Sequence, residues 1–268
     1  MHSVQSTCPT GYFGTNCKSG VVYNETTVCS SKGTCSAPNT CTCSAGYLGL
    51  LCENVISGLE ISTVAGSSST PGFGGDSGPA TSAQLNQPNS LQISPSGEMY
   101  ISDSTNHVIR KVLLDGTIVT IAGSPGVSGS SGDGQAASAK LFYPAKIFLT
   151  SSHELYIADS NNNKIRKISS NGAISTIAGT GTGGFGGDNQ LATSANLFAP
   201  RGVFVTLNGE VFIADTDNHA IRKIGLDGKI STVAGTPGSY GSSGNGGPAT
   251  SAKLRSPYDV FVTSYGEI

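Results

Sequence analysis

One block of sequence returns at a nearly constant interval in this 268-residue chain. The pentapeptide STVAG at 62–66 recurs in closely similar form at 119–123, 175–179 and 231–235. An aspartate returns at the same interval, as Asp103, Asp159 and Asp215. A period of about 56 residues indicates a fold made of stacked copies of one supersecondary unit.

Each copy has the pattern of four short strands joined by tight turns. In the copy at 197–235, the segments GVFVT, EVFIAD, AIRKI and KISTVA are rich in residues that favour strands, and Asn-Gly and Asp-Gly mark two of the turns. Four strands in a meander form the blade of a β-propeller, and each blade must pack on its neighbours. The sequence therefore predicts an all-β chain with complete repeats at 85–123, 141–179 and 197–235, a strand at 61–66 and an incomplete repeat at 254–268.

These copies resemble the NHL-repeat β-propellers. The resemblance rests on the prolines that open the first strands, the aromatic-Ile-x-Asp of the second strand, the Asn-His pairs at 106–107 and 218–219, and the Ile-Arg-Lys strand. The second repeat departs from the pattern because Asn163 replaces the histidine. The family implies a ring closed by six blades. We therefore expect 61–268 to be a partial NHL-type propeller, and the chain to be a fragment of a longer protein.

All seven cysteines lie within the first 52 residues. A short segment so dense in cysteine is typical of a disulfide scaffold made in an oxidising compartment, and it lacks the paired knuckles of a zinc module. The run CTCSAGYLGLLC at 41–52 resembles the end of an epidermal growth factor-like (EGF-like) module. The resemblance implies such a module at 18–53, the tail of another at 1–17, and a linker at 54–60.

The EGF-like resemblance also implies a disulfide pattern, in which Cys17 pairs with Cys35, Cys29 with Cys41, and Cys43 with Cys52. Cys17 is either the first cysteine of this module or the partner of Cys8, since seven cysteines cannot all pair. Asn24 begins a glycosylation sequon. An EGF-like module before NHL repeats is similar to the teneurin arrangement and to other large secreted or cell-surface proteins. We therefore expect an extracellular location.

The stretch ADTDNHAIRKI at 214–224 has the spacing of a calcium loop. However, Asp217 is replaced by Thr105 and Asn161 in the other copies, and the twelfth position, which should be a bidentate glutamate, is Leu226. We predict no metal and no cofactor here, and a structural turn in which each aspartate accepts backbone N–H bonds and pairs with an arginine. This repeated set consists of Asp103, Asp159, Asp215, Arg110, Arg166 and Arg222.

The sequence argues against an enzyme and against an RNA-binding propeller, and it favours a binding module. A lyase or hydrolase of the six-bladed kind would need an axial metal held by several blades, but His107 and His219 lie in outer hairpins, so we predict no catalytic residue. RNA binding needs a basic surface, whereas the net charge is −2. No apolar run is long enough to span a membrane. The prediction is a non-catalytic binding or adhesion module, a scaffold for an unidentified protein or glycan, without nucleic acid or membrane insertion.

The long glycine-rich segment between repeats is the remaining candidate for a binding surface. Counting strand directions places it on the same face as the Asp-x-x-Asn-His turn. Its ATSA motif is expected to form a short helical turn that spaces the blades.

Overall fold

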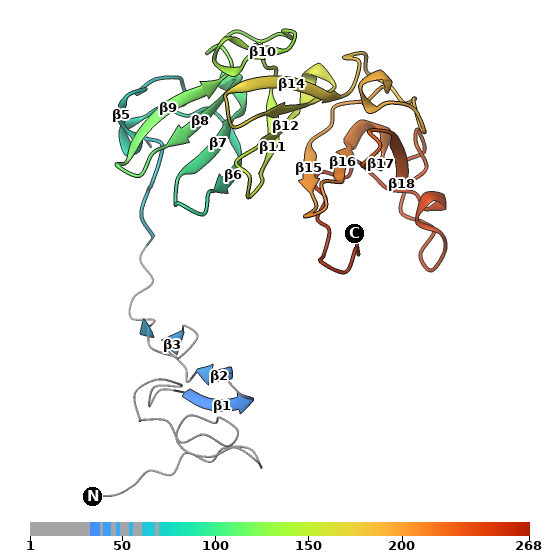
Figure 1. Ribbon diagram of the computed structural model, residues 1–268, viewed down its shortest axis with the longest axis horizontal. Coiled ribbons are helices and arrows are strands. Elements are labelled where there is room, and N and C mark those ends of the chain that lie inside the picture. Colours follow the sequence, from blue (N-terminus) through green and yellow to red (C-terminus); the bar gives the residue numbers. More distant parts are fainter. Residues whose placement is uncertain (1–32, 38–39, 44–46, 49–53, 56–60, 68–69) are drawn as a thin grey trace, which may run out of the picture. The chain divides into compact units, whose positions relative to one another are not determined.

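The structure, a computed structural model, describes residues 33–37, 40–43, 47–48, 54–55, 61–67 and 70–268. The chain divides into two compact units, Met1–Ser62 and Thr63–Ile268. Their elements are labelled in Figure 1. Among the described residues, no helix is long and apolar enough to cross a membrane.

Four short strands are described in the first unit. β1 (Gly33–Ala37) pairs antiparallel with β2 (Thr40–Cys43), and β3 (Tyr47–Leu48) with β4 (Asn54–Val55). The interval 54–60, predicted as a linker, therefore begins with a strand, because its first two residues pair with β3. Cys17, Cys29, Cys52 and Asn24 lie outside the described residues. The EGF-like module, its disulfides and the glycosylation stay predictions.

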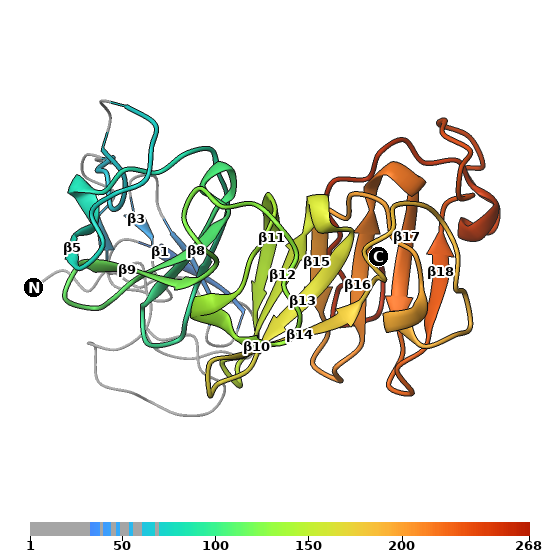
Figure 2. The same ribbon diagram turned by 90° about the horizontal axis from the view of Figure 1, so that it is seen from above.

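Three antiparallel meanders make up the second unit, and they follow one another in chain order (Figures 1 and 2). The first contains β6 (Pro88–Ile93), β7 (Met99–Asp103), β8 (Val108–Val112) and β9 (Thr117–Ala122). The second contains β11 (Pro144–Leu149), β12 (Leu155–Asp159), β13 (Lys164–Ile168) and β14 (Ala173–Ala178). The third contains β15 (Gly202–Val205), β16 (Val211–Asp215), β17 (Ala220–Ile224) and β18 (Ile230–Ala234). The predicted all-β class and its four-stranded blade are confirmed.

A short fifth strand at the outer edge of two blades was not predicted. β5 (Gly78–Pro79) pairs with β9, and β10 (Gly134–Gln135) pairs with β14. The third blade has a single bridge at the same place, between Leu191 and Lys229. These additions cover the free edge of the fourth strand, which would otherwise expose unpaired backbone groups.

The fifth strand also corrects the expected position of the glycine-rich segment. The segment starts on the face of the Asp-x-x-Asn-His turn, where the Gly72 carbonyl accepts a hydrogen bond from Asn106 at 2.7 Å. It then runs beside β9 to the opposite end of the blade, where the Ala80 N–H donates a hydrogen bond to the Gly116 carbonyl at 2.8 Å. The directions of the strands determine only the face on which the segment begins, so they did not predict that it crosses to the other end of the blade.

The short helical turn predicted for the ATSA motif is confirmed in its three copies, and the AASA at 136–139 forms the same turn. These 3-10 turns are η1 (Ala80–Ser82), η3 (Ala136–Ser138), η5 (Ala192–Ser194) and η7 (Ala249–Ser251). The first residue of η1, η3 and η5 is buried. Each of those turns therefore anchors its glycine-rich segment to the blade.

The structure corrects the strand predicted at 61–66 and the first strand expected in the incomplete repeat at 254–268. Residues 61–66 form no strand, and neither does the segment at 257–262 that corresponds to β6, β11 and β15. A strand needs a hydrogen-bonded partner strand, and neither segment pairs with one among the described residues. Ile61 is accordingly fully exposed, whereas Val260 and Val262 still pack on the third blade.

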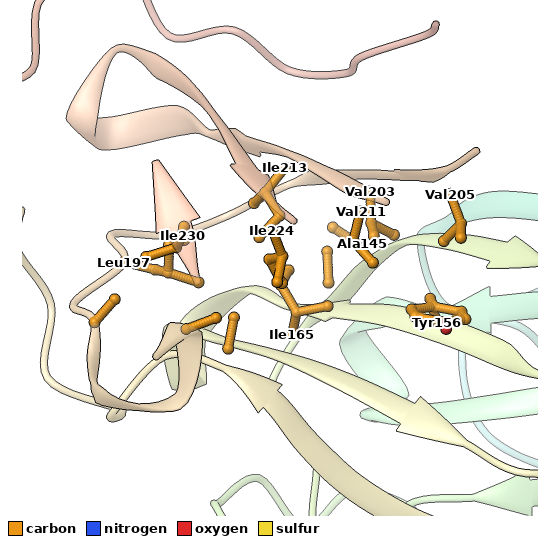
Figure 3. Close-up of a cluster of buried hydrophobic side chains, with 14 residues drawn as sticks. Ala145, Tyr156, Ile165, Leu197, Val203, Val205, Val211, Ile213, Ile224 and Ile230 are labelled. Carbon is orange, nitrogen blue, oxygen red and sulfur yellow. The ribbon is translucent and has the colours of Figure 1, made fainter. Parts of the chain in front are cut away.

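The main hydrophobic clusters lie between blades. One of them joins the second and third blades, with Tyr156 and Ile165 on one side and Ile213 and Ile230 on the other (Figure 3). β6 differs from the other first strands because, among the described residues, no second blade packs on the side that faces away from β11. Leu91 is 48% exposed there, whereas its counterparts Ile147 and Val203 are fully buried.

Candidate functional site

The repeated aspartates end β7, β12 and β16, and each is followed by a 3-10 turn: η2 (Ser104–Asn106), η4 (Ser160–Asn162) and η6 (Thr216–Asn218). Each turn closes with a left-handed residue, His107, Asn163 or His219, with φ between 53° and 61°. Asparagine and histidine are among the residues that adopt this conformation more readily than most. The sequence therefore forms the same tight turn three times.

In the third blade, this turn holds a buried carboxylate whose two oxygens both accept hydrogen bonds. Oδ1 of Asp215 accepts from the Phe198 N–H, and Oδ2 accepts from Asn218, both at 2.8 Å. The Arg222 guanidinium approaches Oδ2 at 3.1 Å, and both side chains are fully buried. Asp159 and Asp103 make the same two hydrogen bonds in their blades.

The structure places each repeated arginine between two carboxylates of its own repeat. Nη2 of Arg222 contacts Asp188 at 2.6 Å, and Nη2 of Arg110 contacts Asp76 at 2.7 Å. Asp76 and Asp188 lie in the glycine-rich segments, and in both cases a phenylalanine ring of the same segment lies 4.8 Å from the guanidinium. The arginine therefore clamps the segment to its blade. The second repeat has a looser clamp, because Arg166 lies 3.8 Å from Asp159 and 3.6 Å from Asp133.

Burial dominates the electrostatics of this clamp. It raises the pKa of Asp159 and of Asp215 to about 6, against the lowering effect of the hydrogen bonds and of the arginine. It also raises the pKa of Asp103. The described residues hold no group of three or more histidine, cysteine, aspartate or glutamate side chains suited to a metal ion.

The histidines of the turns connect neighbouring blades. Nδ1 of His107 lies 3.2 Å from the Tyr143 N–H of the next blade, and Nδ1 of His219 lies 3.2 Å from the Ser256 N–H. Asn163 makes the equivalent contact, because its Oδ1 accepts from the Ala199 N–H at 2.8 Å. The departure of the second repeat therefore replaces one acceptor with another.

A different set of residues meets where the first strands lie side by side. β11 contacts both β6 and β15, and the Lys146 N–H donates to the Arg201 carbonyl at 3.0 Å. A hollow of about 240 Å³ opens there, and it is lined by β6 and by the residues that follow the prolines of the later repeats. We call it the axial pocket. Its lining includes Asn89, Ser90, Lys146, Arg201, Tyr258 and Asp259.

The charges of the axial pocket are unevenly paired. Lys146 forms an ion pair with Asp259. The Arg201 guanidinium lies over the Tyr258 ring at 4.8 Å and 5.9 Å from the Tyr143 ring. Among the described residues, this guanidinium has no carboxylate partner and donates no hydrogen bond. No repeated pattern in the sequence marks these residues, because each of them occurs in one repeat only.

The blades and their clamps define the class of the second unit, which is an NHL-type β-propeller segment. The chain is homologous to teneurins and to NHL repeat-containing proteins. Mouse teneurin-4 is 30% identical over 219 residues, which cover 72% of this chain and 8% of that protein. Human NHL repeat-containing protein 2 is 35% identical over 133 residues, which cover 48% of this chain and 18% of that protein.

One solved structure shows the same fold. It is an auxiliary nutrient binding protein from Bacteroides thetaiotaomicron, with a TM-score of 0.52, 16% identity, and coverage of 73% of this chain and 50% of its own. No protein-family model matches the chain. The chain spans only a small part of the length of the relatives that it matches in sequence, 8% of mouse teneurin-4 and 18% of human NHL repeat-containing protein 2.

Proposed function

We propose that this chain is a non-catalytic binding module of an extracellular or cell-surface protein, and that its propeller binds a ligand at the axial pocket. The observation that carries the proposal is the contrast between two arginines. Arg222 has a counterpart in each of the other two complete blades and forms ion pairs with two carboxylates. Arg201 occurs once, lines the pocket and has no carboxylate partner among the described residues.

The position of the pocket supports a binding role. Its lining comes from four repeats, because the first strands lie next to each other. Concave sites with a few convergent polar groups are the usual places for ligands. The position that carries Arg201 is free to vary from blade to blade, since it is Asn89, Ala145, Arg201 or Tyr258 in successive repeats.

Two alternatives are less well supported. A metal-dependent lyase or hydrolase would need histidines around the axis, whereas His107 and His219 contact the next blade in the turns. An RNA-binding propeller would need a basic face, whereas the chain has a net charge of −2 and one cation of the pocket is already paired. Homology to teneurins supports an extracellular or cell-surface location.

The proposal is tested by screening the chain, made multivalent, against immobilised neutral and acidic glycans and against a displayed peptide library. We expect at least one class to be retained. The signal should be lost when Asn89→Ala and Tyr258→Ala are combined, and kept with Leu226→Ala, which changes an exposed residue outside the pocket. Ligands retained equally by all three proteins would contradict a site at the axial pocket.

A further inference from the structure

We propose that the axial pocket recognises a sugar carboxylate, such as a hexuronic acid unit of a glycan, with Arg201 as the residue that binds the carboxylate. This inference rests on the proposed binding function of the pocket and names its ligand class. It is carried by the unused donors of one half-buried arginine, by the charge of the pocket and by its size.

The contacts of Arg201 leave its hydrogen-bonding edge free. The Tyr258 ring lies 4.8 Å from the centre of the guanidinium and the Tyr143 ring 5.9 Å. Aromatic rings stack on the face of a guanidinium, whereas its N–H donors point outward in its plane. None of these donors has a partner among the described residues. A planar carboxylate matches two of them at once, which makes it the fitting acceptor.

The charge of the pocket favours one negative charge. Asp259 is taken by Lys146, since the two side chains form an ion pair. Arg201 therefore remains as the single uncompensated charge among the residues that line the pocket. A ligand with one carboxylate neutralises it, whereas a polyphosphate or a polyanionic strand would carry more charge than the pocket can match.

The remaining lining favours a sugar over a peptide. The hollow of about 240 Å³ is small, and Asn89 and Ser90 bring amide and hydroxyl groups that can bind sugar hydroxyls. Leu91 and Tyr258 add partly exposed apolar surface, at 48% and 58% exposure. A peptide would also need a deep apolar cleft for the side chain next to its carboxylate, and the residues that line the pocket form none.

The test is calorimetric titration of the full chain with D-galacturonate oligomers, their methyl esters and matching neutral galactose oligomers. The methyl ester keeps the sugar and removes the charge. Arg201→Gln removes the guanidinium, and Arg201→Lys keeps the charge but loses the two-pronged geometry. The matched control is Arg255→Gln, because Arg255 also lies over a tyrosine, Tyr240 at 6.0 Å, but outside the pocket lining.

We expect the acidic oligomer to bind the wild type and Arg255→Gln alike, and to lose about tenfold or more in affinity with Arg201→Gln and on methyl esterification. Arg201→Lys should lie between them. Melting curves must show that every variant stays folded. Equal binding of acid and ester, or displacement by an acidic peptide but by no sugar, overturns the inference. In those cases a glycan or peptide signal that still depends on Asn89 and Tyr258 would leave the proposed function standing.

Discussion

The glycine that ends the fourth strand of each complete blade offers a sharp test of how closely that strand passes the turn before the third strand. Gly179 has φ +91°, and its N–H donates to the Ala192 carbonyl at 3.0 Å. A Cβ at this position would lie 2.2 Å from the Asn163 carbonyl oxygen and 3.0 Å from the Lys164 Cα. Gly123 and Gly235 meet the same obstacle, at 2.3 Å and 2.4 Å from the corresponding carbonyl oxygen. Gly179→Ala should therefore strain the backbone and force two segments apart.

The expected cost has two parts. Placing alanine in a left-handed conformation costs about 1–2 kcal/mol. Relieving the clash adds about 1–3 kcal/mol, as for other overpacked sites. Asn163 cannot retreat freely, because its N–H is bonded to Ser160 and its side chain to the Ala199 N–H. We expect Gly179→Ala to lower the free energy of unfolding by about 2–5 kcal/mol.

Gly172→Ala is the matched control. Gly172 also has a positive φ, +81°, but its Cβ would meet only the Gln135 side chain, at 3.9 Å. It should therefore cost about 1–2 kcal/mol, the conformational part alone. The assay is urea unfolding followed by far-ultraviolet circular dichroism and tyrosine fluorescence, since the chain has no tryptophan. Equal losses in the two variants would show that the close approach to the Asn163 carbonyl contributes nothing, and would refute the argument.

Three further predictions concern the clamp, the turn histidine and the open blade face. Asp159→Ala should destabilise the chain by about 1–3 kcal/mol in urea unfolding, because it leaves the buried Arg166 and two hydrogen-bond donors without this acceptor; an unchanged midpoint contradicts the clamp. Burial lowers the pKa of His107, so its stabilisation is present above about pH 6.5 and is lost as the pH falls through the folded pKa. Between pH 7.5 and pH 5.5, the melting temperature of His107→Asn should therefore fall by less than that of the wild type. Equal falls would mean that protonation of His107 does not affect stability. The chain should self-associate through the open face of β6, where Leu91 and Ile93 are exposed. Leu91→Lys with Ile93→Lys should reduce this association in light scattering without lowering the melting temperature, and unchanged association would mean that this face is not the contact.

Repetition made the blade architecture predictable. Strand-forming segments, turn residues and the aspartate each return three times, so that chance similarity in one copy is outweighed by the others. The partners of the arginines were also within reach of the sequence, because GFGGD occurs at 72–76 and again at 184–188. The short fifth strand was not, since a two-residue pairing leaves no periodic pattern. The strands expected at 61–66 and 257–262 failed for another reason: strand propensity acts only where a partner strand is present.

The residues of the axial pocket could not be predicted from the repeats, for a physical reason. Residues that every blade needs must recur, so repetition identifies the side chains that hold a blade together, as it did for Arg222. A ligand in contact with several blades meets each of them at a different point, so the residues that bind it have no cause to recur. Arg201 illustrates this, because Asn89 and Ala145 occupy its position in the two preceding repeats. In a propeller of this kind, the positions to examine are therefore those where otherwise similar first strands differ, and the structure is needed to show which of them converge.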